Sequence, residues 1–254
     1  MTKNLRIKKG YGDFGNLSKN YDKARKEFPS EAMNYILHKI AKEEPYILDI
    51  GCGTGIATEQ LSENGAKVVG TDIDDQMIRQ AKADNKYKIK YKVAPVEKQP
   101  FEDGTFDAIT AFSSFHWFAN KIALDEIRRV LKPNGWFFVI NKNEAGDFKK
   151  RNKEILKRFI NQEIPDIKKE YDPAKVVNEN GFCSAQDQSF FVIEYFSPEE
   201  AIWYIQTMSV WNMVADEKKE DAITDLKKHF ENIIKEGRVE RQLEIKVVGA
   251  RRAQ

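Results

Sequence analysis

The segment that most constrains the fold is ILDIGCGTG, residues 47–55, in which an apolar run breaks off into a glycine-rich turn. The run has the length and composition of a buried β-strand. Gly51, Gly53 and Gly55 follow at every second position, which removes side chains where backbone can approach a ligand closely. We therefore expect a strand that ends in a ligand-binding turn.

Strand-like and helix-like segments alternate around this turn. A helical pattern from Ser30 precedes the strand, and the segments that follow it are ATEQLSENG (helix), AKVVGTD (strand), DQMIRQAKA (helix), KIKYKV (strand), TFDAITAF (strand), ALDEIRRVL (helix) and, after the turn KPNG, GWFFVI (strand). This alternation predicts an α/β fold with a doubly wound, mostly parallel, Rossmann-like sheet covered on both faces.

The pattern changes after Asn141. EAGDFKKRNKEILKRFINQ and SPEEAIWYIQTMSVW are helical in pattern, SFFVIEYF between them is strand-like, and QLEIKVVGA near the end is strand-like again. We expect residues 1–141 to form the α/β core with an N-terminal lead. Residues 142–238 would form a helical cap, inserted after the fifth strand and carrying one strand of the core sheet, and residues 239–254 the terminal strand of that sheet.

The composition narrows the class of protein. The 254 residues are 41% hydrophobic, enough for one large domain with a cap. Acidic and basic residues are interleaved at a net charge of +2, which favours no nucleic-acid partner. No apolar run reaches membrane-spanning length and the N-terminus has no signal core, so we expect a cytoplasmic protein without a membrane partner. Three histidines and two cysteines lack ligand spacing, and no metal is expected.

Two carboxylates define what the turn would bind. A dinucleotide turn of the type GxGxxG needs glycine where Ile56 stands, whereas the pattern here is D-x-G-x-G-x-G beginning at Asp49. An acid at this position suits an ammonium group better than a pyrophosphate. Asp72 ends the next strand about twenty residues after the turn, the offset at which an acid accepts hydrogen bonds from ribose hydroxyls. The alternatives are a helix cap for Asp72, although Asp74 is better placed for that, and a tight turn without a ligand.

These segments resemble class I methyltransferases, which use S-adenosylmethionine. The resemblance covers residues 47–140 and lies in ILDIGCGTG, VVGTDID, VEKQPFEDGTFDAITAFSSFHWF and LKPNGWFFVI. The lead YDKARKEFP, the run SSFHWF and the terminal VVGARR are similar to the small-molecule branch of the family, its trans-aconitate methyltransferase-like members in particular. The resemblance implies S-adenosylmethionine as cofactor and a small-molecule methyl acceptor.

The same resemblance assigns cofactor-binding roles. The three glycines would line the methionine and ribose part, with Asp49 facing the amino group and Asp72 holding the ribose hydroxyls. For the adenine, the resemblance implies Ile73 on one face and Val96 and Glu97 at the edge, although Pro95 stands where family members often have an acidic residue. For the methionine end, it implies the carbonyl of Phe112, with Tyr21 or Arg25 closing over it. Arg25 would pair with the methionine carboxylate; the alternative is a solvated surface charge.

Methyl transfer from a sulfonium is an in-line displacement, so positioning and water exclusion matter most and a general base is optional. His116 is the histidine that the motif places near the reactive methyl group, as a candidate catalytic residue; its alternative role is to bond backbone at a helix start. Trp117 would wall the pocket. Tyr204, Met208 and Trp211 share a helix face and either contact the acceptor or pack the cap core.

Three other functions remain open from the sequence. An RNA or protein methyltransferase is one, although AFSSFHW differs from the Asn/Asp-Pro-Pro-aromatic run of enzymes that methylate exocyclic base amines. A module that binds S-adenosylmethionine without catalysis is the second, and a dehydrogenase, opposed by Ile56, is the third. Neither the acceptor nor the oligomeric state follows from the sequence.

Overall fold

The computed structural model describes residues 24–83, 85–165 and 171–253. The strands are β1 (Tyr46–Ile50), β2 (Lys67–Asp72), β3 (Lys90–Val93), β4 (Phe106–Phe112), β5 (Leu131–Glu144), β6 (Phe182–Phe196) and β7 (Val239–Arg252). The α-helices are α2 (Ser30–Ile40), α3 (Ile56–Glu63), α4 (Asp75–Ala83), α5 (Lys121–Val130), α6 (Phe148–Lys157), α7 (Pro173–Asn178), α8 (Pro198–Gln206) and α9 (Lys219–Ile233). The short helices η2 (Phe115–Trp117), η3 (Trp211–Met213) and η4 (Asp216–Lys218) complete the described elements.

The strands form one sheet in the order β3-β2-β1-β4-β5-β7-β6. Neighbouring strands from β3 to β5 pair in parallel, with Leu48 opposite Val69 on one side and Ile109 on the other. From the centre, the chain order runs outward through β2 and β3 on one side and through β4 and β5 on the other, so the crevice beyond the carboxyl ends of β1 and β4 is a topological switch point. The predicted α/β fold with a mostly parallel sheet is confirmed.

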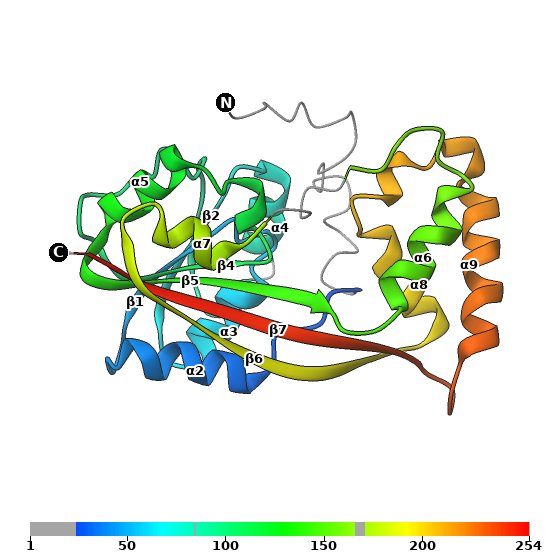
Figure 1. The fold of residues 1–254 in the computed structure, drawn as a ribbon, viewed down its shortest axis with the longest axis horizontal. Helices are drawn as coiled ribbons and strands as arrows, with labels where there is room; N and C mark the ends of the chain where they lie inside the picture. Colours follow the sequence, from blue (N-terminus) through cyan, green and yellow to red (C-terminus); the bar gives the residue numbers. More distant parts are fainter. Residues whose placement is uncertain (1–23, 84, 166–170, 254) are drawn as a thin grey trace. The chain divides into compact units, whose positions relative to one another are not determined.

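Helices cover both faces of the sheet, with α5 and α7 on one face and α2 and α3 on the other (Figure 1). The core on the α5 and α7 side contains Leu48, Ile109, Phe115 and Phe137, none of which is exposed. Alternate residues of each strand supply this core, because side chains along a strand point to opposite faces in turn.

The turn KPNG differs from its expected position between a helix and a strand, because its residues lie within the bounds of β5. Asn134 keeps the left-handed backbone of a turn, with φ of 61°. Phe106 of β4 pairs with Leu131, and pairing resumes regularly with Trp136 opposite Ala108. The turn is therefore an irregularity inside a long strand.

The described residues divide into two compact units. The sheet unit contains residues 27–143, 171–192 and 244–253, and the helical unit contains residues 24–26, 144–165 and 193–243. Each of β5, β6 and β7 contributes residues to both units. The sequence predicted domain boundaries after residues 141 and 238. The chain passes between the two units after residues 143 and 243, two and five residues further along.

The helical unit is built on α6, α8 and α9. Aromatic rings join its elements, with Phe148 within 6.0 Å of Phe196 and 5.9 Å of both Tyr204 and Phe230. Inside it, Arg241 is 3% exposed and is ion-paired with Glu144 and Glu194.

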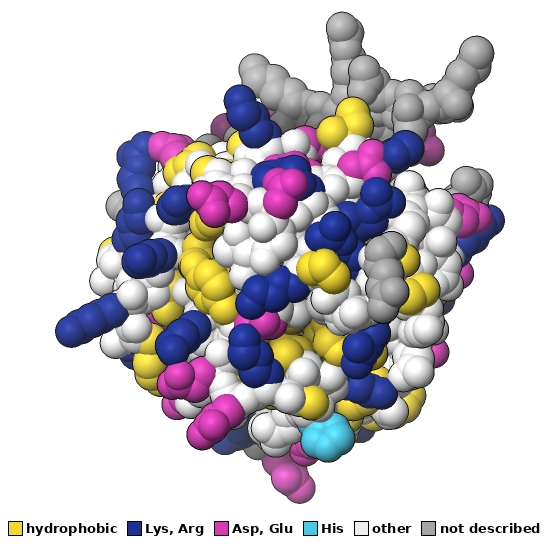
Figure 2. Space-filling view, turned by 90° about the vertical axis from the view of Figure 1, so that its left-hand side faces the viewer, with side chains coloured by type: hydrophobic (Ala, Val, Ile, Leu, Met, Phe, Trp, Pro, Cys, Tyr) yellow, Lys and Arg dark blue, Asp and Glu magenta, His cyan; other side chains and the backbone are white. Residues whose placement is uncertain are grey.

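Two general properties follow from the described residues. None of their helices has the length and apolar character needed to cross a bilayer. On the face shown in Figure 2, Lys and Arg side chains lie among Asp and Glu side chains.

Candidate functional site

The glycine turn after β1 is joined by hydrogen bonds to the end of β2. The Gly53 N–H donates to Asp72 Oδ2 at 2.9 Å, and the Asp74 N–H donates to Asp72 Oδ1 at 2.9 Å. Burial raises the pKa of Asp72, and these backbone donors oppose the rise. The structure thus places Asp72 beside the turn and fixes its carboxylate, and its contact with ribose stays a prediction.

Glycine is required at positions 53 and 55 of the turn for different reasons. A Cβ on Gly55 would overlap the Tyr91 hydroxyl, so internal packing excludes a side chain there. At Gly53, with φ of +56°, a Cβ would meet nothing within 4 Å. Only backbone conformation therefore demands glycine at Gly53 within the protein, and its Cα faces open space beside the fixed carboxylate of Asp72.

Asp49 lies on the α3 side of the sheet and is 1% exposed. Its carboxylate accepts hydrogen bonds from Thr58 Oγ1 at 2.6 Å and from Thr110 Oγ1 at 2.9 Å. Burial raises the pKa of Asp49 to about 7, and the two hydroxyls oppose the rise. This geometry ties β1, β4 and α3 together beneath the turn; the contact with an ammonium group stays a prediction.

The residues predicted for adenine lie on the loops that follow β2 and β3. Ile73 is 72% exposed directly after Asp72, which leaves an apolar surface next to the carboxylate. Val96 is buried, whereas Glu97 is exposed and accepts a hydrogen bond from Asn120 Nδ2 at 3.4 Å.

Phe112, at the end of β4, packs edge-on against Phe28 with ring centroids 4.8 Å apart. Phe28 is held by two backbone bonds to the Gln60 side chain, each of 2.9 Å, and so is anchored to α3. Sequence reasoning did not identify Phe28, although its place just before the Pro-Ser start of α2 marks it as the end of the lead.

The helix η2 brings His116 and Trp117 next to the glycine turn. Ser114, the residue before η2, donates from Oγ to the Ile50 carbonyl at 3.0 Å, and a Cβ on Gly51 would lie 2.7 Å from the Ser114 Cβ. The rings of His116 and Trp117 are 5.0 Å apart and both residues are half-buried. The end of β4 therefore presents His116 close to the residues predicted to hold methionine.

The remaining predicted residues belong to the helical unit. Arg25 donates to the Tyr204 hydroxyl at 3.0 Å, to Thr207 Oγ1 at 3.0 Å and to the Thr207 carbonyl at 3.1 Å. Tyr204 lies in α8, but Met208 and Trp211 follow the end of that helix, so the expectation that all three share one helix face is wrong. All three are nevertheless buried in the apolar core of this unit. The alternative of core packing thus describes their contacts, and their role toward an acceptor stays a prediction. Tyr21 lies outside the described residues.

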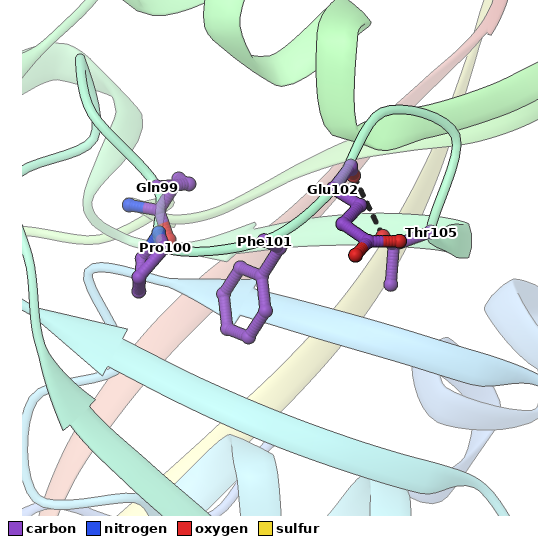
Figure 3. A pocket seen from close by; sticks show the side chains of 5 residues that line it. All are labelled: Gln99, Pro100, Phe101, Glu102 and Thr105. Atoms are coloured by element: carbon purple, nitrogen blue, oxygen red, sulfur yellow. Dashed lines mark hydrogen bonds between the residues drawn. The ribbon is translucent and has the colours of Figure 1, made fainter.

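A shallow, open depression of about 590 Å³ lies elsewhere on the sheet unit (Figure 3). Its lining residues are Gln99, Pro100, Phe101, Glu102 and Thr105. They immediately precede β4, so the depression lies at the amino end of that strand, whereas the glycine turn follows the carboxyl end of β1. This depression is not part of the candidate site.

Comparison with known proteins gives consistent results. Residues 48–139 match a family described as a methyltransferase domain. The chain is 28% identical over 177 residues to a putative methyltransferase of Dictyostelium discoideum, an alignment that covers 63% of this chain and 66% of that protein. The chain spans about half the length of several other curated relatives.

Two solved structures illustrate the likeness in fold. A putative type II methyltransferase from Anaeromyxobacter dehalogenans has a TM-score of 0.66 at 18% identity, covering 90% of this chain and 97% of that one. A phosphoethanolamine N-methyltransferase of Haemonchus contortus, solved with phosphomonomethylethanolamine and S-adenosylhomocysteine, has a TM-score of 0.54 at 16% identity, covering 94% of this chain and 58% of that one. At these identities the likeness concerns the fold.

Proposed function

We propose that the protein, whose residues 48–139 match a family described as a methyltransferase domain, is a class I S-adenosylmethionine-dependent enzyme that methylates a small molecule. The observation that carries the proposal is the pairing of an open glycine backbone at Gly53 with the fixed carboxylate of Asp72. A carboxylate oxygen that accepts one backbone bond retains lone-pair capacity for a ribose hydroxyl. The exposed apolar side chain of Ile73, next to it, suits an adenine ring. The donor set of the site thus fits the cofactor.

Bound S-adenosylmethionine would supply an electrophilic sulfonium methyl group, which is transferred to the acceptor nucleophile while the neutral thioether S-adenosylhomocysteine leaves. The glycine turn and Asp72 would fix the nucleoside, and Phe112 packed against Phe28 would help to exclude water at the end of β4. His116 would take the proton that the acceptor releases. Asp49, with both oxygens bonded to buried hydroxyls, would support the turn from below.

Two observations support a small acceptor. The first is the resemblance of SSFHWF to the small-molecule branch, and the second is that AFSSFHW stands after β4 in place of the Asn/Asp-Pro-Pro-aromatic run. The related fold of the phosphoethanolamine enzyme is consistent with such an acceptor. We also propose a cytoplasmic location, from the sequence features given above.

Two measurements test the proposal. Calorimetry should show that the full chain binds S-adenosylhomocysteine, and binding of NAD without response to S-adenosylhomocysteine would refute it. Incubation with methyl-labelled S-adenosylmethionine and a metabolite extract should then label a small product by mass spectrometry. Label found only in RNA or protein would favour the alternative methyltransferases, and cofactor binding without any label would favour a non-catalytic module.

His116 gives a second test. His116→Ala should leave affinity for S-adenosylhomocysteine nearly unchanged, because the residue lies beside the predicted methionine end rather than on a predicted cofactor contact. Turnover on the identified acceptor should fall by roughly 10²- to 10⁴-fold if the imidazole acts as a base. Loss of cofactor binding, or unaltered turnover, would instead favour the structural role at the start of η2.

A further inference from the structure

Two buried threonines enclose the carboxylate of Asp49 at the carboxyl end of β1. Thr110 of β4 lies directly opposite Asp49 in the parallel pairing of the two strands, and Thr58 lies in the first turn of α3. Both threonines are 0% exposed. Their hydroxyls donate to different oxygens of Asp49, Thr58 to Oδ2 at 2.6 Å and Thr110 to Oδ1 at 2.9 Å. A strand and a helix next to the glycine turn therefore act on one side chain.

These two hydrogen bonds suit an ionised acid. The oxygens of a carboxylate only accept hydrogen bonds, whereas a protonated acid would turn one of them into a donor. The 2.6 Å distance from Thr58 is typical of a hydroxyl that donates to a charged oxygen. A carboxylate has about four acceptor positions, and these bonds use two of them. The threonines thus orient the anion and leave it able to accept a further donor.

The negative charge of Asp49 has no cation beside it in the described part of the chain. Burial raises the pKa of Asp49 to about 7, the two hydroxyls oppose the rise, and the charge of Asp72 adds to it. Near neutral pH, the proton is therefore present on Asp49 in about half of the molecules of the free protein. A positive charge that approached Asp49 would shift this balance toward the anion.

The other titratable groups around Asp49 do not supply that charge. Burial raises the pKa of the Cys52 thiol in the turn and of the Tyr91 hydroxyl on β3, so both groups are neutral near pH 7. Glu59 of α3 acts on Tyr91 and is not among the groups that act on Asp49. Asp72 is itself an acid. A compensating cation must therefore come with a ligand.

We propose that Thr58 and Thr110 are positioning residues that hold Asp49 as an anion for the cofactor, and that the ammonium group of the cofactor replaces a proton of Asp49 when it binds. This inference rests on the proposed function and deepens it. The proton leaves the Asp49 carboxyl group for the solvent, and the ammonium group provides the balancing charge. Affinity for the cofactor should accordingly rise as the pH increases through about 7.

The experiment counts the protons released when the full chain binds a ligand. Calorimetric titrations at pH 7 in phosphate and in Tris differ by the heat that the buffer contributes for each proton it takes up. S-adenosylhomocysteine should release about half a proton per site, because about half of the free protein carries one on Asp49. 5′-Methylthioadenosine keeps the adenine and ribose but has no ammonium group, and it should release none.

Thr110→Val separates positioning of a charge from a structural role. Loss of a charge-assisted hydrogen bond should raise the pKa of Asp49 by about one to two units. At pH 7 the affinity for S-adenosylhomocysteine should then fall about 5- to 50-fold, while the number of released protons rises from about one half toward one. Damage to the fold alone would lower the affinity without raising the proton count. Thr110→Ser restores the hydroxyl and should restore both values.

Thr71→Val is the matched control. Thr71 lies on β2 opposite Ile50, is 0% exposed, and has a hydroxyl that bonds to no described residue. Its replacement should leave the affinity and the proton count at the wild-type values. Asp49→Asn cannot ionise, so binding of S-adenosylhomocysteine to this variant should release no proton.

Three results would overturn this inference and leave the proposed function standing. The first is S-adenosylhomocysteine binding to the wild type without proton release, and the second is equal release with 5′-methylthioadenosine. The third is a loss of affinity in Thr110→Val without a rise in the proton count. If the wild type binds no S-adenosylhomocysteine at all, the proposed function itself fails.

Discussion

A methyl group added at Gly53 tests whether the open backbone of the turn is a binding surface. Gly53 has φ of +56° and Gly65, in the turn before β2, has φ of +91°; a Cβ at either position meets nothing within 4 Å. Alanine in this backbone region costs about 1–2 kcal/mol. Gly53→Ala and Gly65→Ala should therefore destabilise the protein by similar amounts, and each should lower the melting temperature by about 2–8 °C.

Binding should distinguish the two variants. If the nucleoside packs against Gly53, a methyl group inserted into that contact costs about 1–3 kcal/mol, as overpacking does in a core. The affinity for S-adenosylhomocysteine should then fall about 5- to 150-fold in Gly53→Ala. Gly65 lies at the opposite end of the sheet, so Gly65→Ala should bind as the wild type does.

Calorimetric titration of the two folded variants measures the difference directly. Equal affinities for S-adenosylhomocysteine in Gly53→Ala and Gly65→Ala, both with melting curves of a folded protein, would refute the reasoning. The open space at Gly53 would then be a feature of the turn alone.

Three further predictions concern single carboxylates and one buried cation. Asp72→Ala should weaken binding of S-adenosylhomocysteine by roughly 2–3 kcal/mol in calorimetry, and an unchanged dissociation constant would move the ribose contact elsewhere. Burial raises the pKa of Asp49 from 3.8 to about 7, so the folded state favours the protonated acid and stability falls as pH rises through this range. Urea unfolding should show the wild type losing about 3 kcal/mol more than Asp49→Asn between about pH 5 and pH 8, and parallel pH dependences would contradict this. Arg241→Ala leaves two carboxylates without their buried partner and should cost about 3–5 kcal/mol. Lys219→Ala, in an exposed pair, should cost less than about 1 kcal/mol, and equal costs in thermal unfolding would count against the argument.

The sequence alone was enough to predict the features that depend on a local residue pattern. The strand before the glycines, the helix after them and the acid at the end of β2 lie where period and spacing placed them. The proximity of Asp72 to Gly53 followed from a rule about parallel sheets, since carboxyl ends of neighbouring strands meet at one edge.

Other features depend on partners that are remote in the sequence. Alternation along β1 gives the face on which Asp49 lies, but Thr58 and Thr110, which enclose its carboxylate, come from α3 and β4. Phe28 and Phe112 are 84 positions apart with no shared motif, and only packing brings their ring centroids to 4.8 Å. No local sequence pattern predicts a contact of this kind.

Helix α9 was missed for a different reason. Its segment is dominated by charged residues and reads as a polar stretch, while its buried positions, Ala222, Leu226 and Phe230, recur only every fourth residue. Such a narrow stripe suffices because α6, α8 and the segment after α8 also contribute buried residues to the core of the helical unit.

The division of the helical unit among three pieces of chain bears on how the protein folds. Arg25 bonds Tyr204 across 179 positions of sequence, and Arg241 bonds Glu144 across 97. Contacts so distant in sequence must close long loops before they contribute stability, which slows folding relative to a unit with local contacts. The helical unit also cannot be excised as one continuous fragment, and a cut within β5, β6 or β7 would separate its pieces from one another. Circular permutants opened in a surface loop of the sheet unit should keep those three strand connections, and with them the route by which the pieces assemble.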